Sequence, residues 1–251
     1  MQSFTAEAAS LLKRYVSDGD SILDIGCGEL TTFSHLVNNL GVSPAALLAF
    51  DLSWSRIRAG RNYASAHLNR FALERLSLFT ADISEIPLLS KSVDVVVSNH
   101  ALEPNGGRER ELLEEVLRVA RRYAVLFEPS YELNSSEGRA RMESLGYIRG
   151  LENAAQSLGA TVEDVVPLHS GSNKLNPTAA FVIKPAEGPI FAPGHQFADP
   201  GGNSPLQRYD TFFFSPERGV SYPIIDGIPI LRSSAAVLTS AMAAQPQNVS
   251  N

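Results

Sequence analysis

Short apolar runs alternate along the chain with segments in which apolar residues recur at helical spacing. The apolar runs have the length of buried strands and lie at residues 21–25, 46–51, 76–80, 93–98 and 124–127. The segments of helical spacing lie at residues 4–16, 30–40, 53–67, 109–121 and 137–158. Strands that alternate with helices predict βαβ units, right-handed crossovers and a parallel sheet.

The pattern changes in the last third of the chain. Residues 161–168 and 178–184 are two strand-like runs close together, which suits an antiparallel edge of the sheet. Residues 185–208 are rich in Pro and Gly and lack periodicity, and β character resumes at residues 209–231. We therefore expect an α/β domain over residues 1–184, a small β module over residues 185–235, and a disordered tail over residues 236–251.

Composition narrows the class of protein. The 251 residues carry a net charge of -6, which argues against binding to a nucleic-acid backbone. Cys27 is the only cysteine, so an internal disulfide and a multi-cysteine zinc site are excluded. No apolar run reaches transmembrane length, and the first residues lack the pattern of a signal peptide. We expect a cytoplasmic enzyme with no membrane partner and no bound metal.

A glycine turn follows the first predicted strand. The run at residues 21–25 leads into Gly26-Cys27-Gly28, and the next helix begins close behind it. A dinucleotide site of the G-x-G-x-x-G type would need glycine where this chain has Thr31. Asp24 precedes the turn, and a carboxylate there suits a ligand with ammonium or hydroxyl donors better than a diphosphate. An ordinary turn between a strand and a helix is the alternative.

With these residues the chain resembles the class I methyltransferases that depend on S-adenosylmethionine (SAM). Asp24, Gly26 and Gly28 match the family's first motif, D/E-x-G-x-G-x-G, and Leu30 replaces its third glycine. The resemblance covers about residues 1–184. It implies a Rossmann-like, doubly wound, mostly parallel seven-stranded sheet whose last strand is antiparallel, and it implies SAM as the cofactor.

Further acids follow the second and third predicted strands, at the sheet edge where α/β proteins bind ligands. The resemblance assigns Asp51 to the ribose hydroxyls of SAM and Asp82 to its adenine amino group. The alternatives are a helix cap for Asp51 and a tight turn for Asp82. The predicted cofactor-binding residues are Asp24, Gly26, Cys27, Gly28, Asp51, Leu52, Ser53, Ala81, Asp82, Ile83, Ser98 and Asn99.

The loop after the fourth predicted strand is expected to carry the catalytic groups. His100 titrates near neutrality and is a candidate general base, with Glu103 as the second candidate. A packed histidine that covers the cofactor is the alternative for His100. The predicted acceptor-binding residues are Asn105, Glu128, Tyr131, Tyr147, Arg149 and His169.

The predicted function is methyl transfer from SAM to a small polar acceptor. Residues 98–105 and 126–132 resemble a bacterial methyltransferase subgroup associated with surface polysaccharide and small-molecule biosynthesis. A sugar or a precursor of a surface polysaccharide or secondary metabolite is therefore the expected acceptor. Methylation of tRNA, rRNA or protein, a non-catalytic regulatory partner and an NAD-dependent oxidoreductase are the alternatives.

Residues 222–231 read Tyr-Pro-Ile-Ile-Asp-Gly-Ile-Pro-Ile-Leu. They resemble the end of a small zinc-ribbon-like module in activator subunits of tRNA methyltransferases, over about residues 187–233. In those proteins paired cysteines precede this segment, and here none follows Cys27, so we expect a metal-free module. It is expected to shape the acceptor pocket or to mediate formation of a homodimer.

Overall fold

The computed structural model describes residues 2–170, 173–189 and 194–239. Within these ranges the central sheet has seven strands in the order β3-β2-β1-β4-β5-β7-β6. Strands β1 to β5 are parallel to one another, and β7 is antiparallel to both β5 and β6. The strands are β1 (Ser21–Ile25), β2 (Ala46–Asp51), β3 (Leu76–Thr80), β4 (Val93–Asn99), β5 (Ala120–Pro129), β6 (Thr161–Pro167) and β7 (Thr178–Lys184). The predicted doubly wound, mostly parallel seven-stranded sheet is confirmed.

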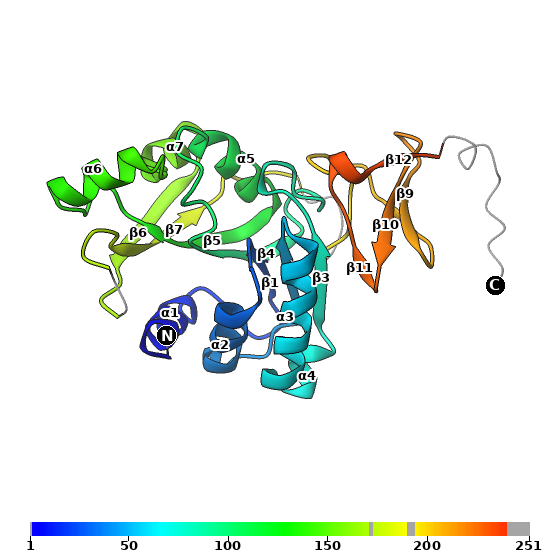
Figure 1. The fold of residues 1–251 in the computed structure, drawn as a ribbon, viewed down its shortest axis with the longest axis horizontal. Helices are drawn as coiled ribbons and strands as arrows, with labels where there is room; N and C mark the ends of the chain where they lie inside the picture. Colours follow the sequence, from blue (N-terminus) through cyan, green and yellow to red (C-terminus); the bar gives the residue numbers. More distant parts are fainter. Residues whose placement is uncertain (1, 171–172, 190–193, 240–251) are drawn as a thin grey trace.

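Helices cover both faces of this sheet (Figure 1). One face carries α1 (Gln2–Leu12), α2 (Thr31–Leu40), α3 (Trp54–His67) and α4 (Arg70–Leu73). The other face carries α5 (Glu109–Val119), α6 (Ser136–Ser144) and α7 (Leu151–Ser157), and a short 3-10 helix, η1 (Ile83–Glu85), follows β3. This arrangement gives three layers, with the parallel strands buried between the helices.

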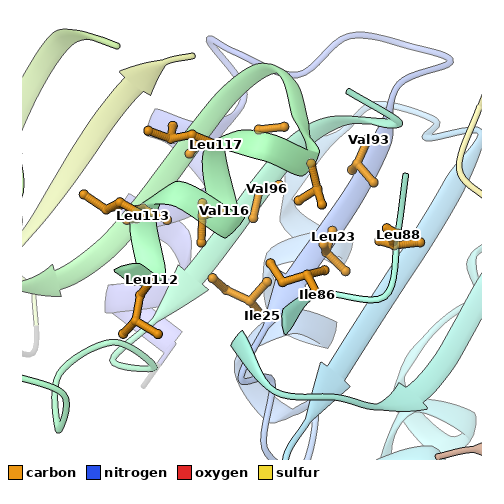
Figure 2. Packing of buried hydrophobic residues seen from close by; sticks show 14 of the residues in the cluster. Leu23, Ile25, Ile86, Leu88, Val93, Val96, Leu112, Leu113, Val116 and Leu117 are labelled. Carbon is orange, nitrogen blue, oxygen red and sulfur yellow. The ribbon is translucent and has the colours of Figure 1, made fainter. Parts of the chain in front are cut away.

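Adjacent residues on the central strands contribute to different hydrophobic cores, because side chains alternate between the two faces of a strand. Leu23 and Val96 belong to the core beneath α5, while Ile22 and Val95 belong to the core beneath α1 and α2. Figure 2 shows Leu113 and Val116 of α5 on the same side of the strands as Leu23 and Val96, with which they form one core cluster. All of these side chains are completely buried, and each contributes about 1.5–3 kcal/mol to stability by leaving water.

The structure shortens one predicted helix and divides another at Gly146 and Gly150, the two positions where its sequence predicts a break. The helix predicted at residues 109–121 ends at Val119, because Arg121 and Arg122 already belong to β5. Their side chains pair with Asp94 and Asp20, which fixes this end of β5 in the sheet. The segment predicted at residues 137–158 divides into α6 and α7 around the two glycines that interrupt its pattern.

A second, antiparallel sheet forms beyond β3. It contains β8 (Gln207–Arg208), β9 (Phe212–Ser215), β10 (Val220–Ile225), β11 (Ile228–Pro229) and β12 (Val237–Leu238), and η2 (Ser233–Ala235) precedes β12. Asp226 and Gly227 join β10 to β11, with positive φ angles of 52° and 73°. Two consecutive residues with positive φ are typical of the tight hairpin turn that Asp-Gly sequences favour.

This small sheet packs against the outer edge of the central sheet, beside β3 (Figure 1). The amide of Leu231 donates to the carbonyl oxygen of Thr80 at 2.8 Å. The ring of Phe197 lies 5.1 Å from that of Phe79 on β3, and Tyr222 on β10 is completely buried in the same core. The small sheet therefore shares a core with the larger one, and a domain boundary after residue 184 stays a prediction.

The C-terminal end differs from its prediction in one respect. A disordered tail from residue 236 is wrong for Val237 and Leu238, which form β12 and pair with β10. Residues 240–251 lie outside the described part of the chain. Among the described residues, no cluster of His, Cys, Asp and Glu side chains is suited to hold a metal ion, and no helix is long and apolar enough to cross a membrane.

Candidate active site

Two adjoining cavities open at the carboxyl ends of β1, β2, β3 and β4. The larger has a volume of about 660 Å³ and the smaller about 270 Å³, and both are lined by Gly26, Arg56 and Asn99. Several predicted cofactor-binding residues line one or both of them, namely Asp24, Gly26, Cys27, Gly28, Asp51, Leu52, Ser53, Ala81, Asp82, Ile83 and Asn99. The parallel topology thus brings together residues from four separate strand ends.

The glycine turn after β1 forms the floor of the smaller cavity. Gly26 and Gly28 have φ angles of 67° and 58°, in the left-handed region that glycine enters without strain. Leu30 also has a positive φ, 59°, at the position where the family motif has glycine. Its side chain is completely buried and lies against Gly60 of α3. Packing of this side chain offsets the backbone strain, which costs about 1–2 kcal/mol.

Asp24 is a buried carboxylate on the wall of the smaller cavity. It has no hydrogen-bond partner among the described residues. Burial raises the pKa of Asp24 well above its ordinary value, and the neighbouring charges of Asp51 and Glu128 raise it further. Close by, the Oδ1 atom of Asn99 is buried and also lacks a partner within the described chain. The unsatisfied carboxylate of Asp24 on the wall of this cavity indicates a ligand that carries a cationic donor such as an ammonium group.

Asp51 and Asp82 line the larger cavity and also order the backbone around it. Asp51 accepts from the amide of Gly28 at 3.0 Å and from the amide of Ser53 at 2.9 Å. Ser53, not Asp51, caps α3 by accepting from Arg56. Asp82 does cap a helix, because its Oδ1 accepts from the amide of Ser84 at 2.9 Å at the start of η1. Each of these two carboxylates also lines the cavity.

His100 turns the chain sharply at the end of β4, with a φ of 53°. Its Nδ1 lies 2.5 Å from Oε2 of Glu103, and its Nε2 lies 2.9 Å from Oγ1 of Thr178. Burial alone would lower the pKa of His100, but the hydrogen bond to Glu103 and the charges of Glu128 and Glu103 outweigh it and raise the pKa. His100 lines the larger cavity, whereas Glu103 lies behind it and orients the ring.

Glu128 lies beneath the loop after β4 and lines neither cavity. Its carboxylate is completely buried and accepts from the hydroxyl of Ser98 and from the backbone amides of Ala101, Leu102 and Glu103, at 2.7–3.1 Å. Burial raises the pKa of Glu128, partly offset by the bond from Ser98. The structure therefore places Glu128 and Ser98 in the support of the loop, away from the acceptor and cofactor positions predicted for them.

The other predicted acceptor-binding residues divide into two groups. Asn105 lines the larger cavity, as expected of a residue that contacts the acceptor. The remaining ones, Tyr131, Tyr147, Arg149 and His169, line neither cavity. Tyr131 bonds to Glu143 at 2.6 Å, and Arg149 lies 3.5 Å from the same carboxylate, so both belong to the surface around α6.

Several residues that line the cavities are not among those predicted from the sequence. They are Glu29, Thr31, Thr32, Phe50, Arg56, Ala101, Pro104, Arg108 and Leu112. Arg56 is the one with the most chemical consequence, because it lines both cavities and lies 3.4 Å from Asp51. The sequence does hold a signal that could have identified Arg56 as a cavity residue. It lies in the first turn of the helix after β2, and residues in a first turn lie next to the end of the preceding strand.

Comparisons with known proteins agree with this geometry. Residues 22–122 match the family described as "Methyltransferase domain". A SAM-dependent methyltransferase from Methanosarcina mazei matches at 18% identity with a TM-score of 0.56, over 70% of this chain and 96% of that one. One from Aquifex aeolicus also matches at 18% identity, with a TM-score of 0.51, over 74% and 92% of the two chains.

A geranyl diphosphate C-methyltransferase from Streptomyces coelicolor, solved with geranyl diphosphate and S-adenosyl-L-homocysteine, matches at 12% identity with a TM-score of 0.54. The match covers 72% of this chain and 80% of that one. No curated protein matches the chain. The fold and the site together define a Rossmann-like methyltransferase. Residues 22–122 of the chain form a methyltransferase domain, and its fold is the one seen in solved SAM-dependent methyltransferases.

The unsatisfied groups of the site suit SAM. The carboxylate of Asp24 can accept from the ammonium group at the amino-acid end of SAM. The free edges of Asp51 and Asp82 in the larger cavity can accept from the ribose hydroxyls and the adenine amino group. SAM supplies an activated methyl group, and the protein contributes binding, orientation and proton transfer.

Proposed function

We propose that the chain methylates a small polar molecule, such as a sugar or a precursor of a surface polysaccharide or secondary metabolite. The observation that carries this proposal is the larger cavity. It extends from the acids at the ends of β2 and β3 to His100 and Asn105 in the loop after β4. Its volume of about 660 Å³ has to hold the nucleoside of SAM as well, so the room that is left beside His100 and Asn105 suits a small acceptor.

Two further observations favour a small acceptor over a nucleic acid. The chain has a net charge of -6, and both cavities carry carboxylates, which repel a phosphate backbone. The geranyl diphosphate C-methyltransferase among the structural matches acts on a small molecule. Besides the residues predicted to bind the cofactor, the larger cavity is lined by His100, Asn105, Arg108 and Leu112, a mixed set that suits a polar acceptor with some apolar surface.

We assign the proton-accepting role to His100, with Glu103 in support. An acceptor hydroxyl or amine loses its proton as it is methylated. The Nε2 atom of His100 would take this proton after releasing Thr178, and Glu103 at Nδ1 would stabilise the resulting imidazolium. Both residues already lie within hydrogen-bonding distance of each other, so only the bond to Thr178 has to change.

The acceptor class can be tested by following a labelled methyl group. Purified protein is incubated with SAM labelled in its methyl group and a cell extract separated into small molecules, RNA and protein. Label in the small-molecule fraction supports the proposal, and label confined to RNA or protein contradicts it. The control is Asp51→Ala, which should weaken SAM binding by roughly 1.5–3 kcal/mol through the loss of charge-assisted hydrogen bonds.

We also propose that residues 187–233 are a metal-free relative of the zinc ribbons of tRNA-methyltransferase activators. Supporting this, the hairpin of β10 and β11 carries the Asp226–Gly227 turn, and its Tyr222 is buried in an apolar core. An apolar core can supply the stability that a zinc ion gives to a ribbon. Elemental analysis that finds stoichiometric zinc in the purified protein would contradict this proposal.

A further inference from the structure

Arg56 occupies the junction of the two cavities. It lies in the first turn of α3, and more than half of its side chain is exposed, so the guanidinium can move. Its Nη1 lies 3.4 Å from Oδ2 of Asp51, longer than the 2.7–2.9 Å typical of charge-assisted hydrogen bonds. Arg56 is exposed and Asp51 is largely buried, so it is the long distance that marks this hydrogen bond as weak. The contact with Asp51 therefore leaves Arg56 available for another anion.

Without Arg56, the charged side chains that line the smaller cavity in the described structure would all be acidic. Asp24 and Glu29 are its acids, and Arg56 is its one basic side chain in the described structure. The amino-acid end of SAM carries one ammonium group and one carboxylate. Asp24 suits the ammonium, so the carboxylate needs donors among the other residues that line the cavity.

We propose that Arg56 binds the carboxylate of SAM and so holds the amino-acid end of the cofactor in the smaller cavity. Thr31 and Thr32, at the start of α2, line the same cavity and add hydroxyl donors. An arginine presents parallel N–H groups that match a carboxylate in a bidentate geometry. This assignment depends on the use of SAM and holds whatever the methyl acceptor is.

Gly28 supports this assignment. Its missing side chain leaves space that the guanidinium of Arg56 fills, because a Cβ atom at Gly28 would collide with it. The guanidinium thus lies against the backbone of the turn, and Arg56 lines the smaller cavity there. When Arg56 moves to a carboxylate, Oδ2 of Asp51 is freed on one side and can accept from a ribose hydroxyl.

The test compares two ligands that differ only in the amino-acid end. S-adenosylhomocysteine carries the ammonium and the carboxylate, and 5′-methylthioadenosine lacks both. Calorimetry with Arg56→Gln should show a loss of roughly 10–100-fold in affinity for S-adenosylhomocysteine, and a change within about twofold for methylthioadenosine. Arg56→Lys should lose less. The matched control is Arg58→Gln, because Arg58 is similarly exposed on α3, pairs with Asp226 and lines neither cavity.

The other results each contradict the proposal. Tighter binding of both ligands to Arg56→Gln would mean that Arg56 blocks Asp51, and an equal loss for both would mean that it only positions Asp51. Unchanged binding to Arg56→Gln would mean that residues at the start of α2, not Arg56, bind the carboxylate. An equal loss of affinity in Arg58→Gln would mean that the overall positive charge of α3, and not a contact with Arg56, attracts the ligand. Thermal denaturation checks that each variant folds. A parent protein that binds neither ligand would refute the cofactor assignment together with this proposal.

Discussion

The carboxylates on the two sides of the active site have different roles. On the cofactor side, Asp24 has no partner among the residues that the structure describes, and Asp51 and Asp82 line the larger cavity. On the acceptor side, Glu128 and Glu103 are engaged by protein donors and line neither cavity. An acid at the end of a parallel strand is therefore either a ligand group or a support for a loop. Asp51 and Asp82 accept from backbone amides and still line the cavity, whereas Glu128 accepts from three amides and a hydroxyl and does not line it.

The backbone conformation after each strand explains this difference. After β4, the positive φ of His100 turns the loop back so that the amides of residues 101–103 point at Glu128. After β1, the glycine turn directs the amide of Gly28 towards Asp51 and leaves Asp24 facing the cavity. Removing one acid from each side should therefore affect different properties of the protein.

The largest effect is expected from Glu128→Ala. The change leaves the hydroxyl of Ser98 and the amides of residues 101–103 without their acceptor in a buried setting. The free energy of unfolding should fall by about 3–5 kcal/mol, because each orphaned group costs about 1–3 kcal/mol. Urea denaturation measures the loss, and Glu128→Gln, which keeps an acceptor oxygen, should lose less. A variant of parental stability that has lost only turnover would instead place Glu128 in contact with the acceptor.

Asp24→Asn should have the opposite effect to Glu128→Ala, weakening the binding of the cofactor without lowering the stability of the protein. Affinity for S-adenosylhomocysteine should fall by roughly 10–100-fold through the loss of a charged partner for the ammonium group. Stability should stay the same or rise, since a buried, unpaired carboxylate is removed. Because the pKa of Asp24 is raised and its ionised form binds the cation, the affinity of the parent should increase as the pH rises through that pKa. Calorimetry at several pH values should show this slope in the parent and not in the variant, and a slope shared by both would assign it to another group.

The same comparison shows how far the sequence could be interpreted. Apolar runs and turn residues gave the strands and the location of the site, because parallel topology gathers strand ends at one edge. Whether Glu128 faces a ligand or a loop depends on where the amides of residues 101–103 point, and no residue pattern encodes that direction. Arg56 was missed for a related reason, because a basic residue in an exposed first turn is also typical of an ordinary helix surface.

A smaller effect is expected at Leu30, on the cofactor side. Leu30→Gly loses a buried side chain, worth about 2–5 kcal/mol, and relieves a left-handed backbone strain of about 1–2 kcal/mol. Leu30→Ala loses most of the same contacts but keeps the strain. The glycine variant should therefore be less destabilised than the alanine variant by about 1 kcal/mol in urea denaturation. Equal stabilities would show that the turn is unstrained with leucine in place.

The smallest effect, and the one that tests the acceptor side, is expected from Glu103→Gln. As a base, His100 acts only when neutral, so turnover in the parent should rise with pH through a pKa raised above the ordinary 6.5. Removing the charge of Glu103 should lower that pKa and move the rise in turnover to lower pH by roughly one unit. The matched control is Thr178→Val, which removes the uncharged partner of Nε2 and should leave the profile nearly in place. If Glu103→Gln keeps the parental profile and turnover, His100 only packs beside the cofactor, and alignment of the reactants drives methyl transfer without a base.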